Sequence, residues 1–153
     1  MPKNAIDLLK EDHAHVRRLL EQLADTTSRA AKTRADLLEK IARELGAHTR
    51  IEEEIFYPAY REAGGSEHNQ MFFEATEEHR AVDSLVLPDL QKTDVQSDSF
   101  SGRCKVLKEL VLHHVEEEEQ ELFPQARKSM DRELLLELGE RMAERKKELM
   151  KQL

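Results

Sequence analysis

The spacing of apolar residues predicts a protein made almost entirely of α-helices. Hydrophobic side chains recur every three or four positions over residues 4–24, 33–57, 67–87 and 102–123, which places each set on one face of a helix. A fifth amphipathic segment begins at Asp131 and reaches Lys151. No segment shows the period-two alternation of a half-buried strand. We therefore expect an all-α fold: an antiparallel up-down four-helix bundle with an additional C-terminal helix.

Capping and turn-forming residues agree with these boundaries. Asn4 and Asp131 are suited to cap the first and fifth helices, because their side chains can accept hydrogen bonds from free N–H groups of the first turn. Pro58 is compatible with the end of the second helix. Loops are expected at residues 63–66 and 91–101, where glycine and polar residues gather.

Length and composition fit a single domain. A chain of 153 residues can bury a core of its own. Charged residues make up 37% and aromatic residues 5%, with only five glycines and four prolines, which favours long helices joined by few turns. We expect one domain over residues 1–153, comprising a bundle at 4–127 and a C-terminal helix at 131–152.

Charge and cysteine content exclude several classes of partner. The net charge of −8 argues against nucleic-acid binding, which needs clustered lysine and arginine. No apolar run approaches the length of a membrane span, and the N-terminus lacks the apolar core of a signal peptide. Cys104 is the only cysteine, so no internal disulfide is possible. These features predict a cytoplasmic protein.

An internal repeat with an offset of 66 residues carries the strongest functional signal. Apolar positions follow this offset, for example Val16 with Val82 and Pro58 with Pro124. Three pairs of polar residues on the apolar faces follow it as well: His13 and His79, His48 and His114, and Glu52 and Glu118. A core needs the apolar positions to recur, but it does not need histidine and glutamate in the same register. We therefore interpret these six residues as metal ligands.

Helical geometry predicts that these residues meet. Residues four apart share a helix face, so each histidine of the second and fourth helices points the same way as its glutamate. A carboxylate inside a bundle is costly to bury unless it is paired or bound to a metal. Four imidazoles and two carboxylates suit iron, manganese or zinc, and the mixed nitrogen and oxygen donors favour iron or manganese.

The number of donors favours two metal ions. Six donors would saturate one octahedral ion, whereas two octahedral ions offer about twelve positions. The histidines would occupy four, two bridging carboxylates four, and an oxo or hydroxo bridge two. One position would then remain open on each ion for a small molecule.

The chain resembles the hemerythrin-like, HHE-type cation-binding domains. Their pattern of H…HxxxE…H…HxxxE/D matches His13, His48 with Glu52, His79, and His114 with Glu118, and the resemblance covers residues 4–127. It implies an antiparallel four-helix bundle in which these six residues bind two iron ions, with manganese or zinc less expected. The implied partners are a diatomic gas or peroxide, and the chain would be a monomer or a homodimer.

One departure from that family bears on function. Oxygen-carrying hemerythrins have a further histidine one turn from the partner of His79, where this chain has Ala75 and Asp83. The implied site is therefore more symmetric, which makes reversible oxygen carriage less expected and could equally favour reactions with peroxide or nitric oxide. Tyr57 lies just past the ligand face and is either an additional ligand or proton donor, or a core residue.

Residues without a counterpart in the repeat are not expected to bind metal. We interpret His15 and His68 as solvated surface residues, and His113 as a possible support behind the ligands. Glu53 and Glu119 are repeat partners but point about 140° away from the ligand histidines, so they are expected behind the ligands.

Three functions remain open. One is a di-iron protein that binds O2 or NO for sensing, storage or detoxification. The second is a di-iron enzyme that consumes hydrogen peroxide or reduces nitric oxide, and the third is an iron-responsive structural module. The Glu-x-x-His motif of ferritin-like proteins and the His-Glu-x-x-His motif of zinc proteases are both absent. The C-terminal helix would cover the bundle or mediate dimerisation, and Arg145, Lys146 and Lys147 would suit its C-terminal end electrostatically.

Overall fold

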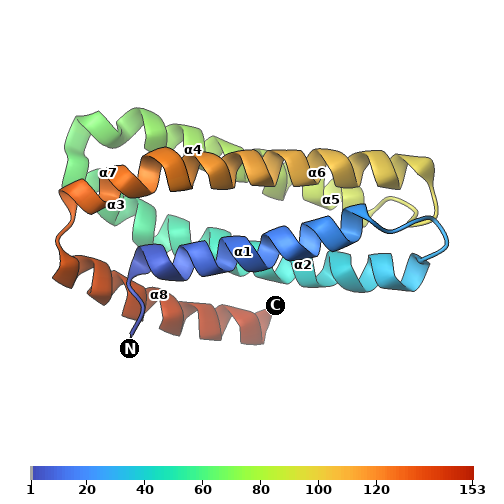
Figure 1. Cartoon of the computed structure of the whole chain (residues 1–153), viewed down its shortest axis with the longest axis horizontal. Helices are drawn as coiled ribbons and strands as arrows, with labels where there is room; N and C mark the ends of the chain where they lie inside the picture. Colours follow the sequence, from blue (N-terminus) through green and yellow to red (C-terminus); the bar gives the residue numbers. More distant parts are fainter. Residues whose placement is uncertain (1) are drawn as a thin grey trace.

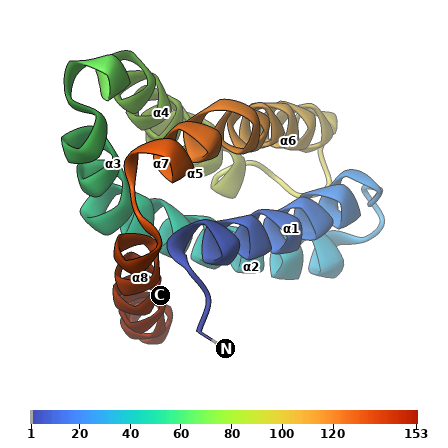
Figure 2. The same cartoon turned by 60° about the vertical axis from the view of Figure 1, so that its left-hand side comes forward.

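The computed structural model describes residues 2–153 and confirms the all-α fold (Figure 1). Four long helices form an antiparallel bundle: α1 (Ala5–Ala24), α2 (Ala31–Ile51), α4 (Asn69–Ala81) and α6 (Asp98–Glu117). Shorter elements extend or connect them: η1 (Glu52–Phe56), α3 (Tyr57–Gly64), η2 (Gly65–His68), η3 (Val82–Val86), α5 (Leu87–Gln91), η4 (Glu118–Leu122) and α7 (Phe123–Ser129). The last helix, α8 (Arg132–Gln152), packs against α1 and α2 (Figure 2).

Side-chain caps set the starts of three helices. Asn4 Oδ1 accepts a hydrogen bond from the N–H of Asp7 at 2.8 Å, and Asp131 Oδ1 accepts one from Leu134 at 2.8 Å, as predicted. Ser97 caps α6, which therefore begins at Asp98 rather than at residue 102. The loop predicted at residues 91–101 is correspondingly shorter.

The expectation that the second helix ends at Pro58 is wrong. The chain remains helical through this proline to Gly64, and it turns at Gly65, whose φ of 57° is easy only for glycine. Proline inside an α-helix lacks an N–H and clashes with the carbonyl four residues earlier. A π-helical turn, η1, precedes Pro58 and relieves this conflict, because its hydrogen bonds span five residues instead of four.

The same device occurs three times. The π-turns η1, η3 and η4 each lie directly before a residue followed by proline, namely Pro58, Pro88 and Pro124. In η1 the N–H of Tyr57 bonds to the carbonyl of Glu52, so residues five apart return to the same face. Both Glu52 and Tyr57 are consequently fully buried.

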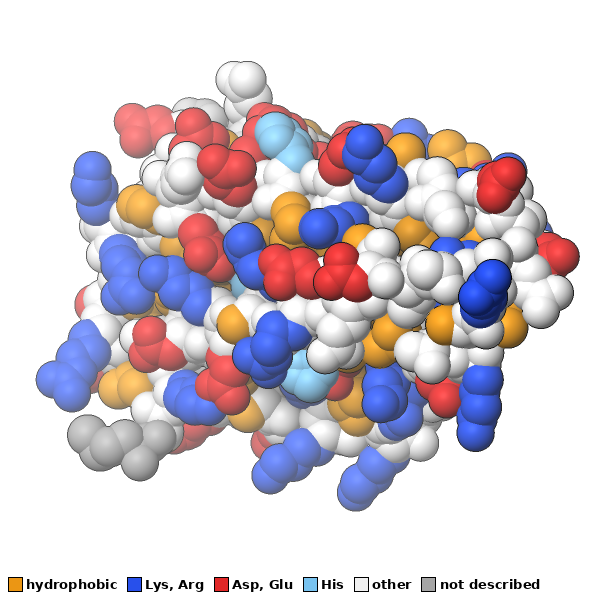
Figure 3. All heavy atoms as spheres, turned by 45° about the vertical axis from the view of Figure 1, so that its right-hand side comes forward, with side chains coloured by type: hydrophobic (Ala, Val, Ile, Leu, Met, Phe, Trp, Pro, Cys, Tyr) orange, Lys and Arg blue, Asp and Glu red, His pale blue; other side chains and the backbone are white. Residues whose placement is uncertain are grey.

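The apolar core forms two clusters on either side of a buried polar layer. One cluster joins α1, α3, α7 and α8, and the other joins α1, α2, α5 and α6. Between them lie the six predicted ligands. On the outside, acidic and basic side chains are interspersed over the face shown in Figure 3. None of the helices in residues 2–153 is long and apolar enough to cross a membrane.

Helix α8 is held by both apolar and polar contacts. Its residues Leu138, Met142 and Leu149 are almost fully buried. Arg145 Nε lies 3.1 Å from Glu54 Oε1 in η1, so Arg145 reaches a neighbouring helix rather than only balancing the end of its own. Gly139 marks the closest approach to the N-terminal segment, where an added Cβ would lie 2.3 Å from the carbonyl oxygen of Lys3.

We expect Gly139→Ala to lower the free energy of unfolding by about 1–3 kcal/mol, because the new methyl group collides with backbone. Gly102 in α6 is the matched control, since a Cβ there meets nothing within 4 Å. Gly102→Ala should raise the free energy of unfolding by about 0.5–1 kcal/mol through helix propensity. Urea denaturation followed by circular dichroism checks both values, and equal effects of the two substitutions would contradict the close approach at Gly139.

Candidate metal centre

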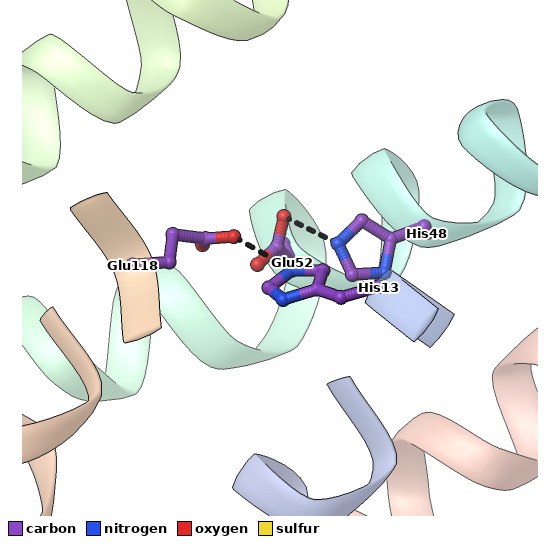
Figure 4. Close-up of side chains that lie close together, drawn as sticks. All are labelled: His13, His48, Glu52 and Glu118. Carbon is purple, nitrogen blue, oxygen red and sulfur yellow. Dashed lines mark hydrogen bonds and ion pairs between the residues drawn. The ribbon is translucent and has the colours of Figure 1, made fainter. Parts of the chain in front are cut away.

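The structure brings all six predicted residues together in the middle of the bundle. They come from four different segments of the repeat: His13 from α1, His48 and Glu52 from α2 and η1, His79 from α4, and His114 and Glu118 from α6 and η4. None is more than 7% exposed. Figure 4 shows four of them, with the Glu52 and Glu118 carboxylates facing each other and the rings of His13 and His48.

Two histidine pairs are spanned by two carboxylates. Glu52 Oε1 lies 3.2 Å from His48 Nε2 and 3.1 Å from His79 Nε2. Glu118 Oε1 lies 3.0 Å from His13 Nε2 and 3.3 Å from His114 Nε2. The ring centroids are 5.0 Å apart for His13 and His48, and 4.6 Å apart for His79 and His114. Each carboxylate therefore contacts one histidine of each pair.

Each histidine has a second carboxylate behind it. The Nδ1 atoms lie 2.7–3.0 Å from carboxylate oxygens in four pairs: His13 with Glu119, His48 with Asp12, His79 with Glu53, and His114 with Glu78. Donation from Nδ1–H to these carboxylates fixes the tautomer and leaves the Nε2 lone pair free to face the centre. This is the arrangement found behind metal-bound histidines in proteins.

Two of these four outer carboxylates agree with the prediction from the sequence. Glu53 and Glu119 were expected behind the ligands, and they lie there. Asp12 and Glu78 were missed, although they are acidic in both repeats and directly precede His13 and His79. Adjacent residues point about 100° apart on a helix. Asp12 and Glu78 therefore turn away from their neighbouring histidines and reach histidines on other helices.

The three histidines outside the candidate centre differ in how well the structure agrees with their predicted exposure. His15 is exposed, as predicted. His68 is buried, so its assignment to the surface is wrong: its ring stacks on Tyr60 at 4.0 Å, and its Nδ1 lies 2.7 Å from the Tyr60 carbonyl oxygen. His113 is 62% exposed and contacts Glu117 at 3.2 Å and Glu78 at 3.7 Å.

Tyr57 reaches the centre and makes its two halves unequal. Its hydroxyl donates to Glu118 Oε2 at 2.7 Å and lies 3.3 Å from His114 Nε2. Its ring stacks on His79 at 5.3 Å between centroids. In the other half its repeat partner, Phe123, stacks on His13 at 5.7 Å but has no hydroxyl.

The buried charges shift the ionisation of these groups. Burial alone would lower the pKa of His48, but the neighbouring Glu52 and Asp12 carboxylates outweigh it and raise that pKa to about 10. Burial would raise the pKa of Glu118, but the neighbouring histidines hold it well below its usual value. Burial and the adjacent Glu118 and Glu52 charges raise the pKa of Tyr57 well above its usual value.

The donor set fits metal cations. His48 Nε2 and Glu52 Oε2 are buried without a hydrogen-bond partner, which is costly for polar atoms unless a cation lies between them. Six carboxylates surround the four imidazoles: Asp12, Glu52, Glu53, Glu78, Glu118 and Glu119. Donor atoms lie within 4.8 Å of one another in two buried groups that share Glu52, namely His13, His48, Glu52 and Glu118, and Glu52, His79 and His114. A third group, Glu78, His113 and Glu117, is partly exposed.

A small cavity adjoins the four histidines on the side of the apolar cluster that joins α1, α2, α5 and α6. Its volume is about 30 Å³. Apolar side chains line much of it, together with Thr49 and Asp83: Val16, Leu45, Val82, Val111 and Val115. Asp83 is one of the two residues one helical turn from His79, where oxygen-carrying hemerythrins were said to have a further histidine. It lies on the cavity wall. Ala75 belongs instead to the apolar cluster on the opposite side of the centre.

Comparison with known proteins agrees with this geometry. The chain is 28% identical over 148 residues to the protein Rv2633c of Mycobacterium tuberculosis, covering 95% of this chain and 87% of that protein. It is 25% identical over 130 residues to a DNA nickase of Nostoc. That match covers 85% of this chain but only about a third (35%) of the nickase.

A solved structure shows the same fold. The crystal structure of a hemerythrin HHE cation-binding domain-containing protein from Mycobacterium kansasii, a homologue of Rv2633c, matches with a TM-score of 0.85 and 27% identity. The match covers 98% of this chain and 89% of that one. The family model for the hemerythrin HHE cation-binding domain matches residues 4–126. This chain therefore belongs to the hemerythrin HHE cation-binding family.

Proposed function

We propose that the protein holds two iron ions, one beside His13 and His48 and the other beside His79 and His114. Glu52 and Glu118 would reach both ions. The donor atoms of neighbouring ligands lie 3.0–3.3 Å apart. The mixed donor set and the family both favour iron over zinc.

The function that the geometry supports best is the binding of O2 or NO for sensing, storage or detoxification. The observation that carries this proposal is the cavity of about 30 Å³ against the histidine rings. That volume holds one or two molecules of the size of water, and it excludes larger organic substrates. Its aliphatic wall suits a small apolar gas.

The chain's own residues prepare the site for such a ligand. Bound iron would supply open coordination positions and electrons. The carboxylates behind the histidines fix the ring orientations, and the aliphatic side chains limit access of water. Tyr57 places a neutral hydroxyl, already donating to Glu118, next to the His79 and His114 nitrogens.

A second candidate function is supported by the same hydroxyl. An enzyme that consumes hydrogen peroxide or reduces nitric oxide needs a proton donor at the centre. Tyr57 is within 2.7–3.4 Å of Glu118, Glu52, His79 and His114. The hydroxyl carries its proton at neutral pH, as a tyrosine ordinarily does, and it lies within hydrogen-bond reach of the groups at the centre.

Metal content tests the proposed ligands. We expect about two iron ions per chain after anaerobic loading. His48→Ala should retain about one, because only one histidine pair is damaged, whereas Glu52→Ala should weaken both positions by 10–100-fold or more. His15→Ala is the control and should match the wild type. Elemental analysis with visible spectroscopy measures this, and one zinc per chain, or no iron after loading, would refute the di-iron centre.

Tyr57→Phe separates the two functions. If the protein only binds gas, wild type and variant both show reversible spectral changes with NO or O2 and no turnover. If it is an enzyme, we expect multiple turnovers of peroxide or NO per site and a rate about 10²–10⁴-fold lower in Tyr57→Phe at unchanged iron content. Tyr60→Phe is the matched control, since the Tyr60 hydroxyl bonds to Gln125 outside the centre.

Metal removal should make stability depend on pH. In the metal-free protein the pKa of His48 is about 10, above its value of about 6.5 in the unfolded chain. The resulting stabilisation is complete below pH 6.5 and is lost as pH rises toward 10. Metal binding requires neutral imidazoles and strengthens with pH. We therefore expect the difference in melting temperature between loaded and chelator-treated protein to grow from pH 6.5 to 9, and a shrinking difference would contradict this account.

A further inference from the structure

Helix α8 contacts the centre through one side chain. Lys146 Nζ lies 2.5 Å from Asp12 Oδ1, and the other oxygen, Asp12 Oδ2, lies 3.0 Å from His48 Nδ1. Lys146 also lies 3.5 Å from Glu44 in α2. A continuous path of polar contacts therefore runs from the C-terminal helix to a ligand of the candidate metal centre.

This contact has no counterpart in the other half of the repeat. Glu78 occupies the position equivalent to Asp12 and contacts His114, the repeat partner of His48. Within residues 2–153, Lys146 is the only lysine or arginine in ion-pair contact with any of the four outer carboxylates. Helix α8 lies outside the repeat and packs mainly along α1, α2 and η1, as Figure 2 shows for the first two.

Burial explains why Asp12 needs this partner. The Asp12 side chain is 6% exposed, whereas those of Glu78, Glu119 and Glu53 are 24%, 34% and 40% exposed. Water can stabilise the charge of the three more exposed carboxylates. A nearly buried carboxylate requires a cation or further hydrogen bonds. Lys146 supplies both.

The ion pair affects the ligand in two ways. By binding Oδ1, Lys146 leaves Oδ2 directed at His48 Nδ1, and this fixes the orientation of the ring. By drawing negative charge from the carboxylate, it weakens the electron donation that a carboxylate passes through histidine to a metal. Neither effect operates on His114, which Glu78 contacts without a lysine or arginine.

We infer that Lys146 is a positioning residue of the metal centre, which acts through Asp12 on His48 and makes the His13–His48 position electronically distinct from the His79–His114 position. The inference rests on the proposed di-iron centre. It adds to the difference caused by Tyr57, whose hydroxyl lies in the opposite half. Each metal position thus has one feature that the other lacks.

Mössbauer spectroscopy of the full chain loaded with ⁵⁷Fe tests this assignment. Wild-type protein should show two iron environments. Lys146→Met should alter only one of them, because it changes both the orientation of His48 and the charge behind it, and Lys146→Arg should restore the wild-type spectrum. Lys147→Met removes the same charge at the next residue. Because the Lys147 side chain is exposed, this substitution should leave the spectrum unchanged.

Asp12→Asn shows whether Lys146 acts through Asp12. This substitution should perturb the same iron environment, and adding Lys146→Met to it should change nothing further. An additional effect in the double variant would overturn the inference, because Lys146 would then act by another route. Asp12→Asn also carries the test if Lys146→Met does not fold, as judged by circular dichroism: a perturbation of both environments, or of neither, overturns the inference.

The outcomes separate this inference from the proposed function. If wild-type protein does not hold two iron ions, the di-iron centre fails and the role of Lys146 fails with it. If wild-type protein holds two ions and the Lys146→Met spectrum is identical to it, only the role of Lys146 fails.

Discussion

The structure depends on how the negative charge that is buried in the middle of the four-helix bundle is compensated. Two carboxylates lie between four imidazoles, and four further carboxylates stand behind those rings. This layer separates the apolar core into two clusters, so it interrupts the burial that normally stabilises a bundle. Cations at the centre would bind the carboxylates and imidazoles of this layer together and so cross-link four helices. The same buried residues therefore determine both how the core is divided and whether the protein can bind cations.

Local helix geometry serves the same requirement. An α-helix would place Tyr57 about 140° from Glu52, but the π-turn returns both to the buried face. The same turn follows Glu118, where it brings Phe123 against His13. Pro58 and Pro124 favour these turns because they cannot donate the hydrogen bond of a regular helix. The two prolines thus help to place the aromatic rings of Tyr57 and Phe123 beside the candidate centre.

The features that could be predicted from the sequence are those that the 66-residue repeat determines. The 66-residue offset and the apolar stripes predicted the bundle and the convergence of the six polar residues, because both depend on periodicity along the chain. The π-turns were missed since proline is more often read as a helix end. His68 was placed at the surface because nothing in its neighbours indicates stacking on Tyr60. The contact of Lys146 with Asp12 was not predicted, because it joins residues 134 positions apart and α8 has no repeat partner.

The crossed contacts between the two halves have an evolutionary consequence. His13 bonds to Glu119 of the second half, and His79 bonds to Glu53 of the first. Reciprocal contacts of this kind are those of a two-fold symmetric dimer. Two copies of one helical hairpin, each with a single HxxxE motif, would present the same donors. Joining such copies into one chain frees each to mutate alone. The Tyr57 hydroxyl, which its repeat partner Phe123 lacks, and the contact of Lys146 with one half only are differences that a dimer of identical hairpins could never acquire.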